Sequence, residues 1–201
     1  MSRYTGPRLR IMRRLGVELP GLSRKSLERR PQPPGQHGAA RRRKVSDYAL
    51  HLIEKQKLRY HYGLTERQLR RAVQEATAGT GESGARLAEL LERRLDNLVF
   101  RAGFAPTIPA ARQLVRHGHI LLNGRRADIP SMRVARGAVV SVRERSRTLP
   151  LCADHDARTS LTPPWLAVDR AVLSARLSEL PDADAIPFPL ELRLVIEFYA
   201  R

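Results

Sequence analysis

The stretch from Arg93 to Arg143 constrains the fold most strongly, because it joins a helical pattern to short strand patterns through a recognisable turn. An apolar stripe recurs there at helical spacing, formed by Ala110, Ala111, Leu114 and Val115. Gly118 follows and predicts the end of the helix, since glycine adopts a left-handed cap at little cost. His119 to Asn123 predicts a strand, Asn123-Gly124 a tight turn, and Ala138 to Arg143 a closing strand.

Arginines flank these elements in two groups. Arg112 and Arg116 lie four residues apart on the helix, so both side chains project from one face. Arg125 and Arg126 follow the turn directly. Guanidinium groups match phosphate oxygens in geometry, so two such groups can grip the phosphates on either side of an RNA groove. The stretch therefore predicts a small αβ RNA-binding unit of two helices and a short antiparallel sheet.

The distribution of charge indicates an anionic partner. The 201 residues carry a net charge of +17, which points to nucleic acid or an anionic membrane. Residues 1–44 hold 13 Lys and Arg against 2 Asp and Glu, residues 85–150 hold 13 against 5, and residues 151–201 hold 5 against 8. Because no apolar run reaches membrane-spanning length and no signal peptide opens the chain, we expect a soluble cytoplasmic or organellar-matrix protein without a membrane partner.

Residues 1–44 predict a basic, irregular and extended arm. They contain five prolines and five glycines and show little hydrophobic periodicity. Tyr4 lies among basic residues and offers a face for base stacking. In the PPGQHG run at 33–38, Gly35 and Gly38 allow a phosphate to approach the backbone. His37 can donate a hydrogen bond to that phosphate. The interpretation of His37 as a turn residue that faces solvent is equally plausible.

Three helices are predicted between the arm and the central unit. The first covers 45–61, with an inward stripe of Tyr48, Ala49, Leu52, Ile53 and Gln56. The second covers 66–78 and opens with a capping box from Thr65 to Gln68. The third covers about 85–101 and carries leucines at the most regular helical spacing in the chain, so we expect it to form core.

The C-terminal quarter predicts less regular structure. Residues 151–164 form a polar connector, after which we expect Trp165 and Leu166 to pack against the helices. Residues 169–180 have a helical pattern, and 181–189 predict a loop. The pattern from Leu192 to Tyr199 fits either a terminal strand or a short helix.

The residues that often carry catalysis or bind metal are isolated in this sequence. Cys152 and His155 have the spacing of half a zinc site, but no second pair accompanies them. His117 and His119 flank the predicted helix end without a third ligand, and Asp96 is better placed to cap or to pair with a neighbouring arginine. No phosphate-binding glycine loop, dinucleotide fingerprint or nucleophile elbow occurs. We therefore expect no enzyme, no cofactor and no metal.

Motifs along nearly the whole chain resemble one family. In the central stretch they are RLDN at 94–97, ARQLVRHGHI at 111–120, NG at 123–124 and VVSVRE at 139–144, which resemble the S-four type RNA-binding domain. Outside it, RYTGP at 3–7, RRPQPPGQHG at 29–38, EKQKLRYHYGL at 54–64, PPWLAVD at 163–169 and LVIEFYAR at 194–201 are similar to the S-four family of bacterial small-subunit ribosomal proteins.

This resemblance implies a fold and a function. The fold is α+β, with an irregular basic arm at 1–44, a helical domain at 45–92 and 165–201, an inserted S-four type domain at 93–155 and a connector at 151–164. The function is that of a structural protein of the small ribosomal subunit in the cytoplasm. It binds a multi-helix junction in the 5′ domain of the rRNA early in assembly, beside ribosomal proteins S-five and S-three and near the path by which mRNA enters.

The resemblance and the basic segments together predict the RNA-binding residues. They are Arg3, Tyr4, Arg8, Arg10, Arg13, Arg14, Arg29, Arg30, Gln36, His37, Lys44, Lys55, Lys57, Arg59, Arg70, Arg112, Gln113, Arg116, His117, Asn123, Arg125 and Arg126. Because structured RNA is recognised largely through its shape and backbone, we expect few base-specific contacts.

Two departures from the family pattern change individual expectations. Some members carry an N-terminal zinc-binding cysteine cluster, whereas the single cysteine here is Cys152. An arginine that the family often has near position 108 is replaced by Ile108, within Pro106-Thr107-Ile108-Pro109. Pro109 falls in the first helical turn, where a missing N–H is tolerated. The alternatives are an RNA-modifying enzyme or a ribosome-rescue factor that uses the same small domain.

Overall fold

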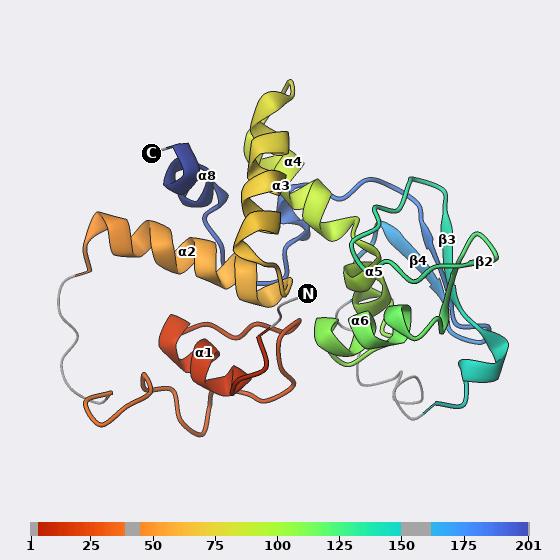
Figure 1. Cartoon of the computed structure of the whole chain (residues 1–201), viewed down its shortest axis with the longest axis horizontal. Coiled ribbons are helices and arrows are strands. Elements are labelled where there is room, and N and C mark those ends of the chain that lie inside the picture. The colour runs from red at the N-terminus through yellow and green to blue at the C-terminus, as the bar shows by residue number, and fades with distance from the viewer. Residues whose placement is uncertain (1–3, 39–44, 150–161, 201) are drawn as a thin grey trace. The chain divides into compact units, whose positions relative to one another are not determined.

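The computed structural model describes residues 4–38, 45–149 and 162–200. The chain divides into two compact units. Unit 1 comprises Met1–Leu87 and Ile186–Arg201, and unit 2 comprises Ala88–Ala185. A unit that contains the sheet thus interrupts a helical unit in the sequence, as Figure 1 shows along the colour bar. This arrangement confirms the predicted α+β class with an inserted αβ domain.

The helices of unit 1 are α1, α2, α3, the first part of α4, and α8. Their bounds are Arg8–Leu15, Asp47–His61, Glu66–Ala78, Ser83–Glu92 and Leu192–Ala200. α2 packs against α1 on one side and against α8 on another. The predicted capping box is confirmed, because Thr65 accepts from the backbone N–H of Gln68 while the Gln68 side chain accepts from that of Thr65.

Part of the N-terminal segment is folded, which differs from the extended arm that its composition predicts. α1 buries Ile11 and Met12, and the irregular segment after it buries Leu19 and Leu22. The N–H of Gly21 also donates to Nδ1 of the buried His61 on α2. The four apolar side chains supply the hydrophobic gain that an ordered segment needs, so the remaining irregular backbone is held against a core.

α8 resolves the choice between strand and helix that the C-terminal pattern leaves open. Its Val195 is fully buried, and its Tyr199 donates a hydrogen bond of 2.7 Å to Glu66 on α3. Glu197 lies 3.1 Å from Nε2 of the buried His51 on α2. Helix α8 is therefore fastened to both neighbouring helices by polar contacts as well as by packing.

Unit 2 combines two helices with an antiparallel sheet of five strands. The helices are α5, Leu95–Arg101, and α6, Ile108–Arg116; 3-10 turns occur at Glu144–Ser146 and Ala183–Ala185. The strands are β1 Ile120–Leu122, β2 Arg125–Arg126, β3 Val139–Val142, β4 Leu166–Asp169 and β5 Ser174–Leu177. Their order is β2-β1-β3-β5-β4, and α5 and α6 lie on one side of the sheet (Figure 1).

The long helix predicted over 85–101 is interrupted, and the cause lies outside its own sequence. Arg94 has an extended backbone, with φ −66° and ψ 138°, between α4 and α5. The backbone of Arg93 to Asp96 instead bonds to the segment 130–134: Val134 N–H donates to Arg93, and Leu95 N–H donates to Met132. A tertiary contact thus takes the backbone groups that helix continuation would need.

The sheet extends further than the central stretch predicts. The residues 169–180, which have a helical pattern, instead form a turn and strand β5, and Leu166 lies in β4. Side chains alternate along the strands, so Leu166, Val140, Val142, Ala175 and Leu177 are buried on one face. Trp165 is buried as predicted and lies over the Arg101 guanidinium of α5. Residues 165–177 therefore belong with unit 2 rather than with the helical segment.

Candidate nucleic-acid interface

The C-terminal end of α6 presents exposed polar and basic side chains. Arg116 in the last turn, the cap residue His117 and Gln113 are exposed, while Leu114 and Val115 are buried. Thr107 caps the other end by accepting from the N–H of Ala110, and a proline is tolerated in the first turn as predicted. The helix therefore holds its outward side chains on a backbone that is fixed at both ends.

A tight hairpin follows α6 and positions the next basic residues. Asn123 and Gly124 both have positive φ, 49° and 76°, which is the conformation of a two-residue hairpin turn. Asn123 also accepts a hydrogen bond of 2.8 Å at Oδ1 from the N–H of Val139. The predicted RNA contact Asn123 thus fastens the hairpin to β3.

Arg125 and Arg126 project from opposite faces of the hairpin, because neighbouring residues of a strand alternate. Both are exposed. The guanidinium of Arg126 lies against Gly118, where an added Cβ would be 2.4 Å from Nε. This places a positive charge beside the last turn of α6, where the helix dipole is negative. Arg126 therefore joins the cluster at the end of α6, and Arg125 stands apart from it.

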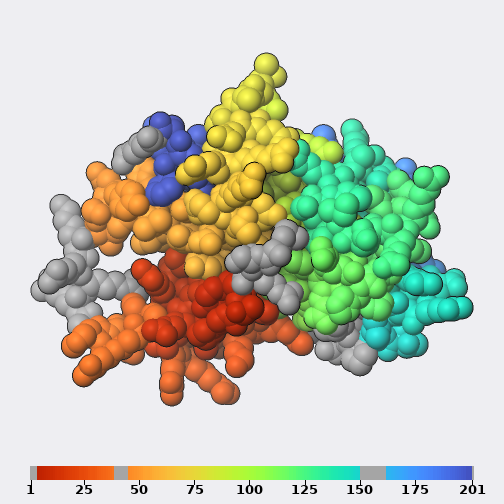
Figure 2. All heavy atoms as spheres, in the orientation of Figure 1, coloured from red at the N-terminus to blue at the C-terminus, as the bar shows by residue number. Residues whose placement is uncertain are grey.

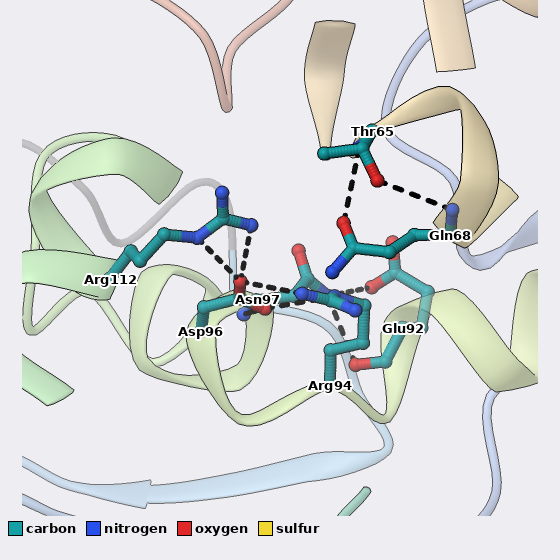
Figure 3. A network of polar contacts seen from close by, with 7 residues as sticks. All are labelled: Thr65, Gln68, Glu92, Arg94, Asp96, Asn97 and Arg112. Atoms are coloured by element: carbon teal, nitrogen blue, oxygen red, sulfur yellow. Dashed lines mark hydrogen bonds and ion pairs between the residues drawn. The ribbon is translucent and has the colours of Figure 1, made fainter. Parts of the chain in front are cut away.

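Arg112 has a different environment from Arg116, although both lie on α6. Its Nε and Nη2 donate to Oδ2 of Asp96 at 3.1 and 2.8 Å. Arg94 donates to both oxygens of the same carboxylate, which is fully buried (Figure 3). The Arg112 side chain is only 18% exposed. The structure therefore gives Arg112 a bond that holds α6 to α5, and it confirms that Asp96 pairs with neighbouring arginines.

A second buried network lies at the junction of α4 and α5. The carboxylate of Glu92 accepts from the Asn97 side chain at 2.9 Å and from Nε of Arg101 at 2.9 Å. Arg101 also donates to the backbone carbonyl of Ala185. Glu92, Asn97 and Arg101 are all at most 3% exposed. The polar residues around the RLDN motif are thus used to build the interior.

The predicted binding residues of the N-terminal segment divide into two groups. Arg8 donates to the carbonyl of Leu22, and Arg13 donates to the carbonyls of Gln32 and Pro33, so both hold the irregular backbone. The others have no such bond within the described residues and are exposed, as Arg8 also is: Tyr4, Arg10, Arg14, Arg29, Arg30, Gln36 and His37. In Figure 2 the red and orange atoms of this segment project from the surface as separate side chains.

The PPGQHG run forms a compact turn. The N–H of Gly38 donates to the carbonyl of Gly35 at 3.2 Å. A Cβ added at Gly38 would lie 1.9 Å from the carbonyl oxygen of Pro33, so only glycine fits this close backbone approach. Gly38 thus serves the turn itself, and Gly35, with φ 110° and no described atom within 4 Å of its Cβ position, remains open to a ligand.

The predicted cations on α2 are engaged within unit 1. Lys55 is 6% exposed and lies 2.8 Å from Glu66, with its ammonium over the Phe198 ring. Lys57 is 9% exposed and donates to Glu54 and to the carbonyl of Pro189. These contacts argue against phosphate binding by either lysine. Arg59 is partly exposed and lies 3.9 Å from Glu66, and Arg70 on α3 is exposed.

Glu66 and Tyr199, which are hydrogen-bonded to each other in unit 1, have shifted pKa values. Burial tends to raise the pKa of Glu66, but hydrogen bonds from Lys55 and Tyr199 and the charges of Lys55 and Arg59 outweigh it, so the pKa lies below its ordinary value. Burial first, and then the hydrogen bond to Glu66, raise the pKa of the Tyr199 phenol. Both shifts favour the charged carboxylate and the neutral phenol that the hydrogen bond between them requires.

Comparisons with known proteins match this sequence to a family. Residues 3–92 match the ribosomal protein S4/S9 N-terminal domain, and residues 93–140 match the S4 domain. The small ribosomal subunit protein uS4 of Methylobacillus flagellatus is 54% identical over 100% of this chain and 98% of its own length. The corresponding proteins of Synechocystis sp. and Geobacillus sp. are 53% and 48% identical, each over 100% of this chain and at least 99% of their own lengths. The chain belongs to the uS4 family.

Membership of the uS4 family decides between the alternatives. The family is structural and non-enzymatic, so the expectation that the chain is not an enzyme is confirmed and the RNA-modifying enzyme is excluded. The full-length match also separates the chain from rescue factors that share only the small domain. The S4 domain of residues 93–140 coincides with α5, α6 and the first three strands except for the end of β3.

Exposed arginines that the sequence analysis did not select adjoin the S4 domain. Arg143 follows β3, and its N–H donates to the carbonyl of His119 beside the end of α6. Arg145 is exposed in the 3-10 turn that comes next. The signal was available in the sequence, because pairing of the predicted strands 119–123 and 138–143 sets Arg143 opposite His119. Both residues extend the candidate surface of this uS4 protein.

Two predicted RNA-binding residues, Arg3 and Lys44, lie outside the part of the chain that the structure describes. Cys152 and His155, which the sequence does not support as a metal site, also lie outside it. Among residues 4–38, 45–149 and 162–200, no group of three or more His, Cys, Asp or Glu side chains could hold a metal ion. Within the same ranges, no helix has the length and apolar character needed to cross a membrane.

Proposed function

We propose that this uS4-family chain is a structural constituent of the small ribosomal subunit in the cytoplasm, and that it binds a multi-helix junction in the 5′ domain of the rRNA early in assembly. The full-length similarity to proteins named small ribosomal subunit protein uS4 supports the ribosomal role. The observation that carries RNA binding is the cluster of exposed cations at the end of α6, formed by Arg116, Arg126 and Arg143.

The cluster suits a phosphate backbone because its helix is held at both ends and its cations face solvent. α6 is capped at Thr107 and ion-paired to α5 through Asp96, so Arg116 extends from a fixed helix. Each cation that meets a phosphate releases counterions, which favours binding at low salt. The exposed side chains of Gln113 and His117 add donors around the cluster, and the exposed Arg125 offers a separate cation on the opposite face of the hairpin.

In unit 1 we propose that the exposed residues Tyr4, Arg10, Arg14, Arg29, Arg30, Gln36, His37 and Arg70 contact RNA as well. Arg8, Arg13, Lys55, Lys57 and Arg112 act mainly by holding the scaffold, because each has a partner in the fold. Arg59 has features of both groups, since it lies near Glu66 and is also partly exposed.

The surroundings of the bound chain are part of the proposal. We place it near the path by which mRNA enters, beside ribosomal proteins S-five and S-three. The charge of the C-terminal quarter favours a protein neighbour there, because residues 151–201 hold 8 Asp and Glu against 5 Lys and Arg and would repel RNA.

Binding to an isolated 5′-domain junction RNA, compared with a fully paired duplex of equal length over a salt series, tests the proposal. We expect tighter binding to the junction and a steep fall of affinity with salt. Arg116→Ala should weaken junction binding, and the salt slope should decrease by about one for each phosphate that the variant no longer neutralises. Equal and weak binding of the wild-type chain to both RNAs would contradict the proposal.

A further inference from the structure

A groove of about 810 Å³ lies within unit 1 between α1, α2 and the Pro33-Pro34 turn. Its volume falls within the range of roughly 300–1,000 Å³ that is typical of sites for small ligands. Tyr4 and Tyr60 line it together with the N-terminal half of α2. No acidic residue lines the groove among the described part of the chain. Its chemistry is therefore apolar, aromatic and positively charged.

The floor of the groove is an apolar helix face that the fold leaves partly open. Ala49, Leu52, Ile53 and Gln56 belong to the stripe of α2 that the sequence pattern predicts to face inward. All four retain partial exposure, and Tyr48 of the same stripe is 59% exposed. The buried side of α2 instead carries His51, Leu58 and His61. A partly exposed apolar face of this kind is a surface that a ligand can cover.

Two arginines of α1 border this face. Arg10 and Arg14 lie four residues apart, so they project from the same side of the helix. Both line the groove and are exposed, and neither side chain has a hydrogen bond or ion pair among the described residues. Arg13, by contrast, donates to Gln32 and Pro33 and so holds the opposite wall. The groove thus combines a fixed wall with two cations that the described part of the fold does not engage.

The aromatic side chains supply the third component of the site. Tyr4 is 44% exposed, and its ring meets that of Tyr60 edge-on, with 5.6 Å between the centroids and an angle of 77°. A Cβ at position 6 would lie 2.6 Å from the Tyr4 hydroxyl, so Gly6 leaves the space in which that ring lies. The edge-on arrangement leaves aromatic surface available to a further planar group.

We infer that this groove binds one unpaired nucleotide of the RNA, with its base against Tyr4 and the apolar floor and its phosphate at Arg10 and Arg14. The inference rests on the proposed RNA-binding function and assigns a specific subsite to it. A nucleotide joins a flat apolar base to an anionic phosphate, which is the combination that the groove complements. A paired base cannot enter, because its faces and its edge are already occupied within the helix.

Affinity measurements on the full chain test the inference, with the junction RNA and the fully paired duplex as probes. Tyr4→Ala should weaken junction binding by roughly 10-fold, because stacking of one base is removed, and should leave duplex binding unchanged. Tyr4→Phe keeps the aromatic face and should bind like wild type. Ultraviolet cross-linking of the wild-type complex should join Tyr4 or Tyr60 to a single unpaired nucleotide.

The double variant Arg10→Ala/Arg14→Ala has a matched control in Arg67→Ala/Arg71→Ala. Arg67 and Arg71 are also exposed arginines four residues apart, on α3 of the same unit. Arg10→Ala/Arg14→Ala should reduce the affinity for junction RNA more than Arg67→Ala/Arg71→Ala does. The inference is overturned if Tyr4→Ala binds the junction as tightly as Tyr4→Phe, and Arg10→Ala/Arg14→Ala binds it as tightly as Arg67→Ala/Arg71→Ala. This holds whether or not a protein segment uses the groove. A wild-type chain that fails to bind junction RNA would instead contradict the proposed function.

Discussion

Asp96 and Arg112 form an ion pair in which a fully buried carboxylate on α5 accepts two hydrogen bonds from a guanidinium on α6. Arg94 binds the same carboxylate, so one acidic group pairs with two arginines in the interior of the S4 domain. Asp96 lies between these two positive charges and lowers the cost of holding them near one another at this depth.

Asp96→Asn should therefore destabilise the protein strongly. The amide retains the shape of the side chain but cannot neutralise Arg94 and Arg112, and uncompensated buried charges cost about 3–5 kcal/mol. Urea denaturation measures the decrease in the free energy of unfolding. Asp128→Asn is the matched control, because Asp128 is exposed in the same unit and has no partner among the described residues; it should change stability by less than about 0.5 kcal/mol. Similar stabilities for the two variants would contradict the role of Asp96.

Arg112 and Arg116 should behave differently when each is replaced by alanine. Arg116→Ala removes an exposed cation, so it should reduce the salt slope of RNA binding by about one and leave stability nearly unchanged. Arg112→Ala removes the ion pair with Asp96, so it should lower stability first. A double-mutant cycle between Asp96 and Arg112 should give a coupling free energy of about 0.5–3 kcal/mol. A larger decrease in salt slope for Arg112→Ala than for Arg116→Ala would reverse this assignment.

The acid stability of unit 1 should depend on Glu66. The folded-state pKa of Glu66 lies below its ordinary value of 4.5, so the ionised group stabilises the fold above that value, and the stabilisation disappears as the pH falls through the folded-state pKa. The difference in melting temperature between wild type and Glu66→Gln should be largest near neutral pH and shrink below about pH 4.5. Glu82→Gln replaces an exposed carboxylate without a partner in the described residues and should show no such dependence. A gap between wild type and Glu66→Gln that stays constant across this range would rule out the titration of Glu66 as its cause.

The central elements were predictable because local signals specify them. Gly118 ends α6, Asn123-Gly124 sets the hairpin, and the capping box at Thr65 begins α3; each depends on residues within a few positions of one another. The helix break at Arg94 was not predictable in this way. It arises because the segment 130–134 takes the backbone hydrogen bonds of Arg93 to Asp96, and no local pattern announces that contact.

Two further differences have related causes. In the N-terminal segment, Ile11, Met12, Leu19 and Leu22 are too few and too widely spread to stand out among basic residues, and α1, which carries the first two, contacts α2 far along the sequence. For the binding residues, sequence spacing placed Arg112 and Arg116 on one helix face correctly. It could not reveal that Asp96, sixteen positions earlier than Arg112, forms an ion pair with the Arg112 guanidinium.

Gly118→Ala should weaken RNA binding through Arg126. Gly118 has φ 75°, which strains any other residue, and an added Cβ would also meet the Arg126 guanidinium at 2.4 Å. Gly137→Ala is the matched control, because Gly137 has φ 83° in the same unit but no described atom within 4 Å of its Cβ position. Both variants should be destabilised by about 1–2 kcal/mol through backbone strain. Only Gly118→Ala displaces a cation of the proposed interface, so only this variant should also bind the junction RNA more weakly when both are compared at a temperature where they are folded. Equal RNA affinities for the two alanine variants would mean that Arg126 does not contribute from the position it takes beside α6.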